Sequence, residues 1–407
     1  MTPGLVTRVT FAAAETRSFK RAVIVLEQVG DARVSDDTVQ RVVGDVGREL
    51  AERRDADPKT ADALAARPAE PPPLAVVECD GGRIRMREPG HGRGVHLSGD
   101  KGWRETKNAC LINATCKTFD EDPQAEPPAC FCNAKHVAKI AETEALSVAA
   151  PAGVKPPSAE GDDEDSAPPD DQDWRPRRRL RTVLASMQPS AEFGRQMHRE
   201  AKRRRFFEAV AQAFLGDGLA WNWSIWKQHF GDFTPILDFI HPLSYLFLAA
   251  KAVHALSADD AWSQYLAWMR GCWQGEVGQV IDELQAWQAK LGEPPSNTPD
   301  TDPRAIIAGT ITYLSNNRER MNYPEYRKAG MPVTTAWMES LVKEMNYRTK
   351  GTEMFWNDPQ GAEAILQVRA AALSDDDRLA HHLHHRPGHP FTRRPKPPKI
   401  TSQTCKS

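Results

Sequence analysis

The stretch Ala211–His241, AQAFLGDGLAWNWSIWKQHFGDFTPILDFIH, contains two short apolar runs that each end in an acid. Asp217 follows AFLG, whereas Asp238 follows FTPIL and leads into His241. A run of four or five apolar residues closed by a carboxylate is typical of a buried strand with an acid at its C-terminal end. Open α/β sheets place their sites at that edge. The stretch therefore predicts an α/β fold with acids gathered at one edge of a sheet.

The bulk composition is that of a water-soluble globular protein. The chain has 407 residues, of which 40% are apolar and 27% charged, enough for two or three structural units. No stretch reaches the roughly 18 apolar residues of a membrane span, and the N-terminus lacks the apolar core of a signal peptide. The seven cysteines are an odd number in a long chain, which argues against a disulfide framework. We therefore expect a cytoplasmic protein.

Charge is balanced over the whole chain but uneven along it. Lysine and arginine total 53 against 55 acids, so net charge predicts no particular partner. Acids concentrate in EGDDEDSAPPDDQD, and two basic runs follow, at residues 177–181 and 202–205. A basic face can bind phosphate backbones in a protein of neutral overall charge. We predict DNA contacts from the basic runs, and specifically from Arg177, Arg178 and Arg179.

Residues 1–60 have helical patterns. AAAETRSFKRAVIVLEQVG predicts one helix, and DDTVQRVVGDVGRELAERR, which follows Ser35 and opens on two acids, predicts a second after a short turn. Two helices joined in this way can form a helix-turn-helix, whose second helix enters the DNA major groove. Helical hairpins are also common as scaffold, so both interpretations stay open.

The rest of the chain divides by composition. LAVVECDGGRIRMRE predicts a strand, a turn at Gly81–Gly82 and a second strand, and residues 103–119 predict a further strand of the same sheet. Residues 119–176 are rich in Pro and acids and predict a disordered insertion. The predicted domains are a first core part at 74–244, an all-α insertion at 245–330, a helix that closes the core at 331–375, and a disordered basic, His-rich tail at 376–407.

Three acids occur in the order strand, strand, helix: Asp80, Asp217 and Glu339. Hard divalent cations such as Mg²⁺ prefer carboxylate oxygens held on rigid elements. Two such ions about 4 Å apart can activate a water on one side and stabilise a leaving oxygen on the other. Each acid alone is ordinary at a strand end, so the set depends on its motif context for support.

That context resembles the bacterial insertion-sequence transposases of the ISKra type, relatives of the Mutator-like DDE transposases. The resemblance rests on FLGDGLAWNW, ILDFIHPLSYL, YLSNNRERMNYPEYRKAGMPVTTAWMESLVKEMNYRTKGTEMFW and GAEAILQVRAAALSDD. It runs from about residue 74 to residue 376, and the acidic insertion is its weakest part. The N-terminal region is shorter than such transposases usually carry, which leaves open a truncated copy.

The resemblance implies an RNase H-like core interrupted by an all-α insertion, after an N-terminal helical unit. It implies Asp80, Asp217 and Glu339 as catalytic and metal-binding acids for two Mg²⁺ or Mn²⁺ ions. The implied partners are double-stranded DNA, at the terminal inverted repeats and at the target, and a second copy of the chain in a homodimer. The expected reaction is hydrolysis of the DNA strand at the element end, followed by attack of the freed 3′-hydroxyl on target DNA. Asp238 and His241 match the family's C/D-x-x-H signature, which implies that they brace the site or contact DNA.

Several residues have alternative interpretations. His241 could be a core histidine bonded to Asp238, and Lys343 could form an ion pair with Glu339 one helical turn away. A phosphate-binding role for Lys343, with Arg348 and Lys350, is the preferred alternative.

The aromatic and sulfur-containing residues favour structural roles. Three tryptophans at 221, 223 and 226 are expected to pack the helical insertion against the sheet, rather than to stack on bases. Four cysteines and a histidine within residues 110–136 lack the paired C-x2-C spacing of structural zinc sites, so a zinc site is disfavoured.

Two other functions remain open from the sequence. One is a truncated, catalytically inactive DNA-binding protein derived from a transposase. The other is an RNase H-like nuclease without strand transfer.

Overall fold

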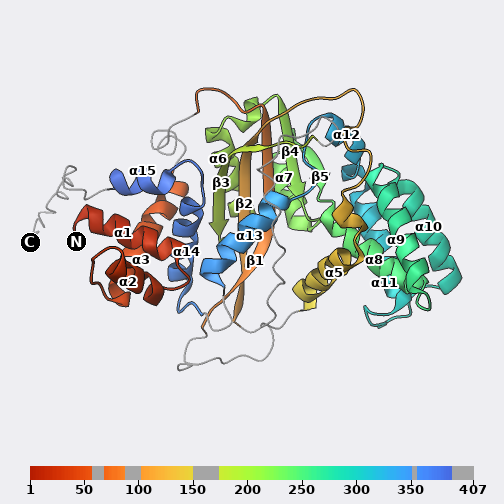
Figure 1. The fold of residues 1–407 in the computed structure, drawn as a ribbon, viewed down its shortest axis with the longest axis horizontal. Coiled ribbons are helices and arrows are strands. Elements are labelled where there is room, and N and C mark those ends of the chain that lie inside the picture. Colours follow the sequence, from red (N-terminus) through yellow and green to blue (C-terminus); the bar gives the residue numbers. More distant parts are fainter. Residues whose placement is uncertain (57–67, 88–101, 150–173, 351–354, 387–407) are drawn as a thin grey trace, which may run out of the picture.

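A mixed five-stranded sheet forms the centre of the molecule (Figure 1). The computed structural model describes residues 1–56, 68–87, 102–149, 174–350 and 355–386. The strands are β1 (Leu74–Arg85), β2 (Trp103–Ala114), β3 (Arg178–Ser186), β4 (Ala211–Gly216) and β5 (Thr234–Leu237), in the order β3-β2-β1-β4-β5. β2 pairs antiparallel with both β1 and β3, whereas β4 pairs parallel with β1 and with β5. This arrangement confirms the predicted α/β class and is consistent with an RNase H-like fold.

The predicted turn at Gly81–Gly82 is wrong, because β1 continues through both glycines. They pair with Lys107 and Thr106 of β2. A Cβ at Gly82 would lie 2.7 Å from the Thr106 hydroxyl and 3.1 Å from the Asn108 side-chain nitrogen. Glycine at this position therefore permits close packing between the strands and does not end the strand.

Helices cover both faces of the sheet. On one face, α6 (Ser190–Arg203) and α7 (Ala220–His229) bury a cluster with Val77, Phe214 and Phe230. On the other face, α13 (Ala336–Thr349) lies across β1 and β2 (Figure 1). The three tryptophans at 221, 223 and 226 belong to α7 and pack on its face of the sheet, and Trp223 also packs against the core of the helical insertion. The prediction that all three tryptophans pack the insertion against the sheet is therefore wrong for Trp221 and Trp226, which pack within the layer formed by α6 and α7.

A helical layer follows β5. It comprises α8 (Ile240–Val253), α9 (Ala258–Trp273), α10 (Val277–Leu291), α11 (Pro303–Asn317), the 3-10 turn η4 (Arg318–Arg320) and α12 (Tyr323–Lys328). Within the described residues, no helix is long and apolar enough to cross a bilayer. Because α8 begins only three residues after β5 ends, the layer is joined directly to the strand edge that carries Asp238.

Part of the stretch expected to be disordered is folded. The 3-10 turn η1 (Ala129–Cys132) and α5 (Ala134–Ala149) precede β3, and α5 packs against α8. Phe131 is buried, and its carbonyl accepts a hydrogen bond from the Tyr265 hydroxyl at 3.0 Å. Asp122 accepts from the Arg327 guanidinium at 2.8 Å. These long-range partners order residues 119–142 despite their polar composition, while residues 150–173 lie outside the described part of the chain.

The two ends of the chain form one helical bundle beside β3 (Figure 1). It contains α1 (Pro3–Glu15), α2 (Phe19–Gln28), α3 (Asp36–Arg54), α14 (Pro359–Ala372) and α15 (Arg378–His384). The sequence predicted one helix where α1 and α2 form, and a disordered tail where α15 forms. Helix α3, which the helix-turn-helix interpretation would place in the DNA major groove, packs so closely on α14 that a Cβ at Gly47 would lie 2.2 Å from the Ala364 carbonyl oxygen. The N-terminal helices are therefore part of the domain and not a separate module.

The segment between α14 and α15 covers the outer edge of β3. The Arg181 N–H donates to the Asp375 carboxylate at 2.7 Å, and the Asp375 N–H donates to the Arg181 carbonyl at 2.9 Å. The Val183 N–H donates to the Ser374 hydroxyl at 3.0 Å. Unpaired edge strands invite pairing with other chains, so these contacts protect the edge of the sheet.

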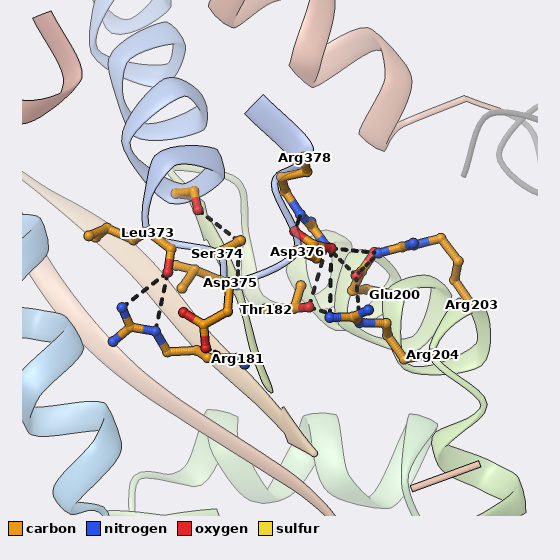
Figure 2. A network of polar contacts seen from close by, with 12 residues as sticks. Arg181, Thr182, Glu200, Arg203, Arg204, Leu373, Ser374, Asp375, Asp376 and Arg378 are labelled. Carbon is orange, nitrogen blue, oxygen red and sulfur yellow. Dashed lines mark hydrogen bonds and ion pairs between the residues drawn. The ribbon is translucent and has the colours of Figure 1, made fainter. Parts of the chain in front are cut away.

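A buried ion network lies beside this edge (Figure 2). Glu200 and Asp376 lie among the guanidinium groups of Arg203, Arg204 and Arg378. Burial alone would raise the pKa of Glu200, but the charges and hydrogen bonds of Arg378 and Arg203 outweigh it and lower this pKa. The network joins α6 to the chain that follows α14, so it fixes the C-terminal helices to the core.

Candidate active site

Asp80 and Asp217 lie side by side on neighbouring parallel strands. Glu78 of β1 pairs with Leu215 of β4, so the register places Asp80 level with Asp217, the first residue after β4. Neighbouring strands are about 4.8 Å apart, and residues at the same level of parallel strands point to the same face. Burial, with the nearby charge of Asp217 second, raises the pKa of Asp80 to about 7. The backbone register thus places the two predicted acids side by side, and the charge of Asp217 disfavours ionisation of Asp80.

Local hydrogen bonds fix Asp217. Its Oδ1 accepts from the Leu219 N–H at 2.9 Å and from the Asn222 side-chain amide at 2.5 Å. Its backbone carbonyl accepts from the Tyr313 hydroxyl at 3.1 Å. Gly218 has φ +99°, and a Cβ there would lie 2.9 Å from the Tyr313 ring. The second glycine of the GDG motif is therefore required by a left-handed backbone and by the close approach of Tyr313.

Asp238 joins three elements at the end of β5. Its side chain is fully buried, and one oxygen accepts from the Thr335 N–H, at the start of α13, at 2.9 Å. The other oxygen lies 2.7 Å from Nδ1 of His241, in the first turn of α8. Because a carboxylate only accepts, Nδ1 carries the proton in this pair. Asp238 therefore fixes α13 and α8 to the sheet, which agrees with the bracing role that the sequence motif implied.

Glu339 lies in the first turn of α13, four residues after Thr335, and its side chain is exposed. Desolvation and the charge of Asp238 raise its pKa, while Lys343 and His241 act in the opposite direction. His241 also lowers the pKa of Asp80 and of Asp217. His241 thus has the same electrostatic effect on all three predicted acids, and the Thr335–Asp238 hydrogen bond places the start of α13 at the end of β5.

The donor set is suited to a hard divalent cation, because it consists of carboxylates on a strand, a strand end and a helix. Among the described residues, however, no group of three or more His, Cys, Asp or Glu side chains is arranged to hold a metal ion. Asp80 and Asp217 form the close pair, and Glu339 interacts with Asp238 and His241. The metal site therefore stays a prediction.

Two polar residues of the site were not predicted from the sequence. Glu78 is fully buried two residues before Asp80, hence on the same strand face, and the Met338 backbone opposes the effect of burial on its carboxyl group. Burial, followed by the charge of Asp238, raises its pKa well above the usual range. The period-two alternation of β1 could have indicated Glu78. For Asn222, which contacts Asp217, the sequence offers no comparable signal.

The predicted DNA contacts on α13 divide into exposed and buried residues. Lys343 and Lys350 are exposed, and the Lys350 ammonium lies 5.5 Å from the Trp103 ring centroid. Arg348 is buried, donates to the Ala13 carbonyl at 2.8 Å, and lies 4.6 Å from the Phe19 ring centroid. Burial lowers its pKa to about 10. Arg348 therefore holds the N-terminal helices against α13, and its predicted phosphate contact is wrong for this fold.

The basic runs lie away from the acids or are internally paired. Arg177, Arg178 and Arg179 lie at the start of β3, which pairs with the end of β2 that faces Leu74 and not Asp80. That separation is six residues of strand, roughly 20 Å. Arg177 and Arg179 are exposed, whereas Arg178 lies 3.8 Å from Asp375. The second run contributes to the ion network of Figure 2 and therefore stabilises the fold.

The cysteines of the disfavoured zinc cluster lie on different segments of the chain. Cys110 is buried within β2, and the Cys116 thiol donates to the Ala329 carbonyl at 3.6 Å. Cys130 and Cys132 belong to the turn η1.

Comparisons with known proteins give limited similarity. No family model matches the chain, and no curated protein sequence matches it. A solved structure, a Drosophila P element transposase strand transfer complex, aligns with a TM-score of 0.34 and 10% identity over 91% of this chain and 92% of that chain. At these values the match carries no functional argument.

Proposed function

We propose that this protein is a DNA transposase of the DDE type, which cleaves the ends of an insertion element and joins them to target DNA. The observation that carries the proposal is the alignment of Asp80 with Asp217 on adjacent parallel strands, with Glu339 on a helix at the same end of the sheet. The motif resemblance to ISKra-type transposases adds the substrate class. The sheet order is also consistent with the RNase H-like core that such chemistry uses.

In the proposed site, Asp80 and Asp217 would hold a divalent cation, Mg²⁺ or Mn²⁺, and Glu339 would complete the ligand set for a second. Bound cations would supply the Lewis acid that lowers the barrier to phosphoryl transfer. The protein's contribution is positioning: two donors orient the Asp217 carboxylate, and Asp238 places α13 relative to the sheet. Positioning and charge neutralisation account for most of the rate in such reactions.

DNA would approach the exposed side of α13. Lys343 lies one turn after Glu339, and Lys350 lies at the far end of the same helix, so both are placed to bind phosphates on one side of the acids. Arg177 and Arg179, at the other end of the sheet, would contact DNA only where it extends about 20 Å from the cleavage site. A homodimer that pairs two element ends is part of the proposal through the resemblance alone.

The decisive experiment is a cleavage assay on double-stranded DNA from the flanks of the encoding element, with Mg²⁺ or Mn²⁺. The wild type should nick the strand at the element end, and Asp217→Ala should abolish the nick. Asp232→Ala is the matched control, since Asp232 is exposed in the loop before β5. Joined products with a target plasmid would separate a transposase from a simple nuclease. Binding without metal-dependent cleavage in all three proteins would refute the catalytic proposal and favour an inactive DNA-binding protein.

A further inference from the structure

Asn222 is a fully buried polar residue at the base of the candidate site. It lies in the first turn of α7, and its backbone N–H donates to the Leu219 carbonyl at 3.1 Å. Buried amides are common in folded proteins when their hydrogen bonds are satisfied. The partners of this amide are Asp217 itself and Cys79, the residue before Asp80, so both belong to the backbone segments that carry the predicted metal ligands.

The side-chain amide of Asn222 connects β1 to the end of β4. Its nitrogen donates to Oδ1 of Asp217 at 2.5 Å, and its oxygen accepts from the Cys79 thiol at 3.4 Å. Cys79 immediately precedes Asp80 but points to the opposite face of the sheet, the face that α7 covers. A carboxylate accepts only from the NH₂ end of the amide, so the two contacts fix the orientation of the amide.

The backbone around Asn222 is adapted to this contact. Gly216, the last residue of β4, is buried, and a Cβ there would lie 3.2 Å from both Cβ and Nδ2 of Asn222. Glycine therefore lets the amide reach the strand end. The Leu219 N–H and the Asn222 amide both donate to Oδ1 of Asp217, which leaves Oδ2 as the oxygen that would meet a cation.

We propose that Asn222 is the positioning residue of the site: it holds the Asp217 carboxylate in its ligand orientation and sets its position relative to Asp80. The proposal rests on the proposed metal-dependent function. Groups that orient metal ligands typically affect metal affinity by 10- to 100-fold. A packing role alone would require only the volume of the side chain, and not its donor.

The test measures Mn²⁺ binding to the full chain by titration calorimetry and by electron paramagnetic resonance, without DNA. Asn222→Leu keeps the branched shape and the number of non-hydrogen side-chain atoms but removes the donor. We expect its Mn²⁺ dissociation constant to rise about tenfold, with an altered Mn²⁺ spectrum and a metal-free melting temperature close to that of the wild type. Ser224→Leu is the matched control, since Ser224 is exposed on the same helix, and its affinity should equal that of the wild type.

Equal Mn²⁺ affinities of the wild type and Asn222→Leu would overturn the positioning role and leave the proposed function intact. Absence of Mn²⁺ binding in the wild type would overturn both, because the metal site itself would then be refuted. If Asn222→Leu melts more than about 5 °C below the wild type, Asn222→Ala replaces it at a temperature below both transitions, and the same outcomes decide.

Discussion

The charge of Asp80 is predicted to destabilise the metal-free protein at neutral and alkaline pH. Its pKa is raised from 3.8 to about 7 by burial and by Asp217. A group whose pKa is raised in the folded state costs nothing while both states are protonated, below about pH 4. The cost then grows as pH rises and is complete above pH 7. Asp80→Asn, which cannot ionise, should therefore be more stable than the wild type at pH 8.

The magnitude follows from the size of the shift. About three pKa units at 1.36 kcal/mol each give an upper bound of about 4 kcal/mol. Asp80 is partly accessible and is coupled to Asp217, so solvent screening and relaxation reduce the expected gain to about 2 kcal/mol. At pH 5 the gain should fall below about 1 kcal/mol, since the folded wild type is then protonated.

The assay is urea unfolding of chelator-treated protein at pH 5 and pH 8. Asp232→Asn, on an exposed loop, is the control and should change stability by less than about 0.5 kcal/mol at either pH. Added Mg²⁺ should stabilise the wild type and not Asp80→Asn, because a ligand that binds only the folded state shifts unfolding. An Asp80→Asn protein no more stable at pH 8 than the control would refute the account of the acid pair as a site of unbalanced negative charge.

Three further predictions test the packing that supports the site. Glu200→Gln leaves three guanidinium groups with a single carboxylate, so urea unfolding should show that the free energy of unfolding falls by about 3 kcal/mol. The control Glu208→Gln removes an exposed ion pair with the same basic run and should cost under about 0.5 kcal/mol. Equal losses in the two variants would contradict the buried network. Glu49 has its pKa lowered to about 2 by hydrogen bonds and ion pairs that outweigh its burial. The stabilisation that the Glu49 carboxylate gives to the folded protein is therefore present above about pH 4.5 and is lost as pH falls toward 2. Glu49→Gln should lower the free energy of unfolding by about 1–2 kcal/mol at pH 7 and by little at pH 2.5. A loss that does not depend on pH would argue against the ion pairs. Gly47→Ala should destabilise the protein by about 2–3 kcal/mol in thermal unfolding, because α3 must move away from α14. Gly44 lies in open space on the same helix, so the control Gly44→Ala should stabilise the protein by up to about 1 kcal/mol. Similar effects of the two substitutions would refute the close packing of α3 on α14.

The sequence by itself determined the features that depend on local patterns. Short apolar runs closed by Asp217 and Asp238 predicted strand ends with acids, and the structure has β4 and β5 end there. The helical spacing after residue 245 predicted the helical layer. Strand alternation and helix periodicity arise from backbone geometry, so they can be recognised without knowledge of tertiary contacts.

Only the tertiary structure decided which charged residues are accessible and which are paired. Arg348 and the arginines of Figure 2 have the same local sequence character as surface phosphate ligands, yet partners more than a hundred residues away along the chain bury them. The same holds for Asn222, whose role depends on two strands that meet only in the folded sheet, and for residues 119–142 and α15, which are ordered by distant contacts. Burial and pairing are properties of the whole fold, because the free energy of a charge depends on every group around it, and its sequence neighbours are only a few of these.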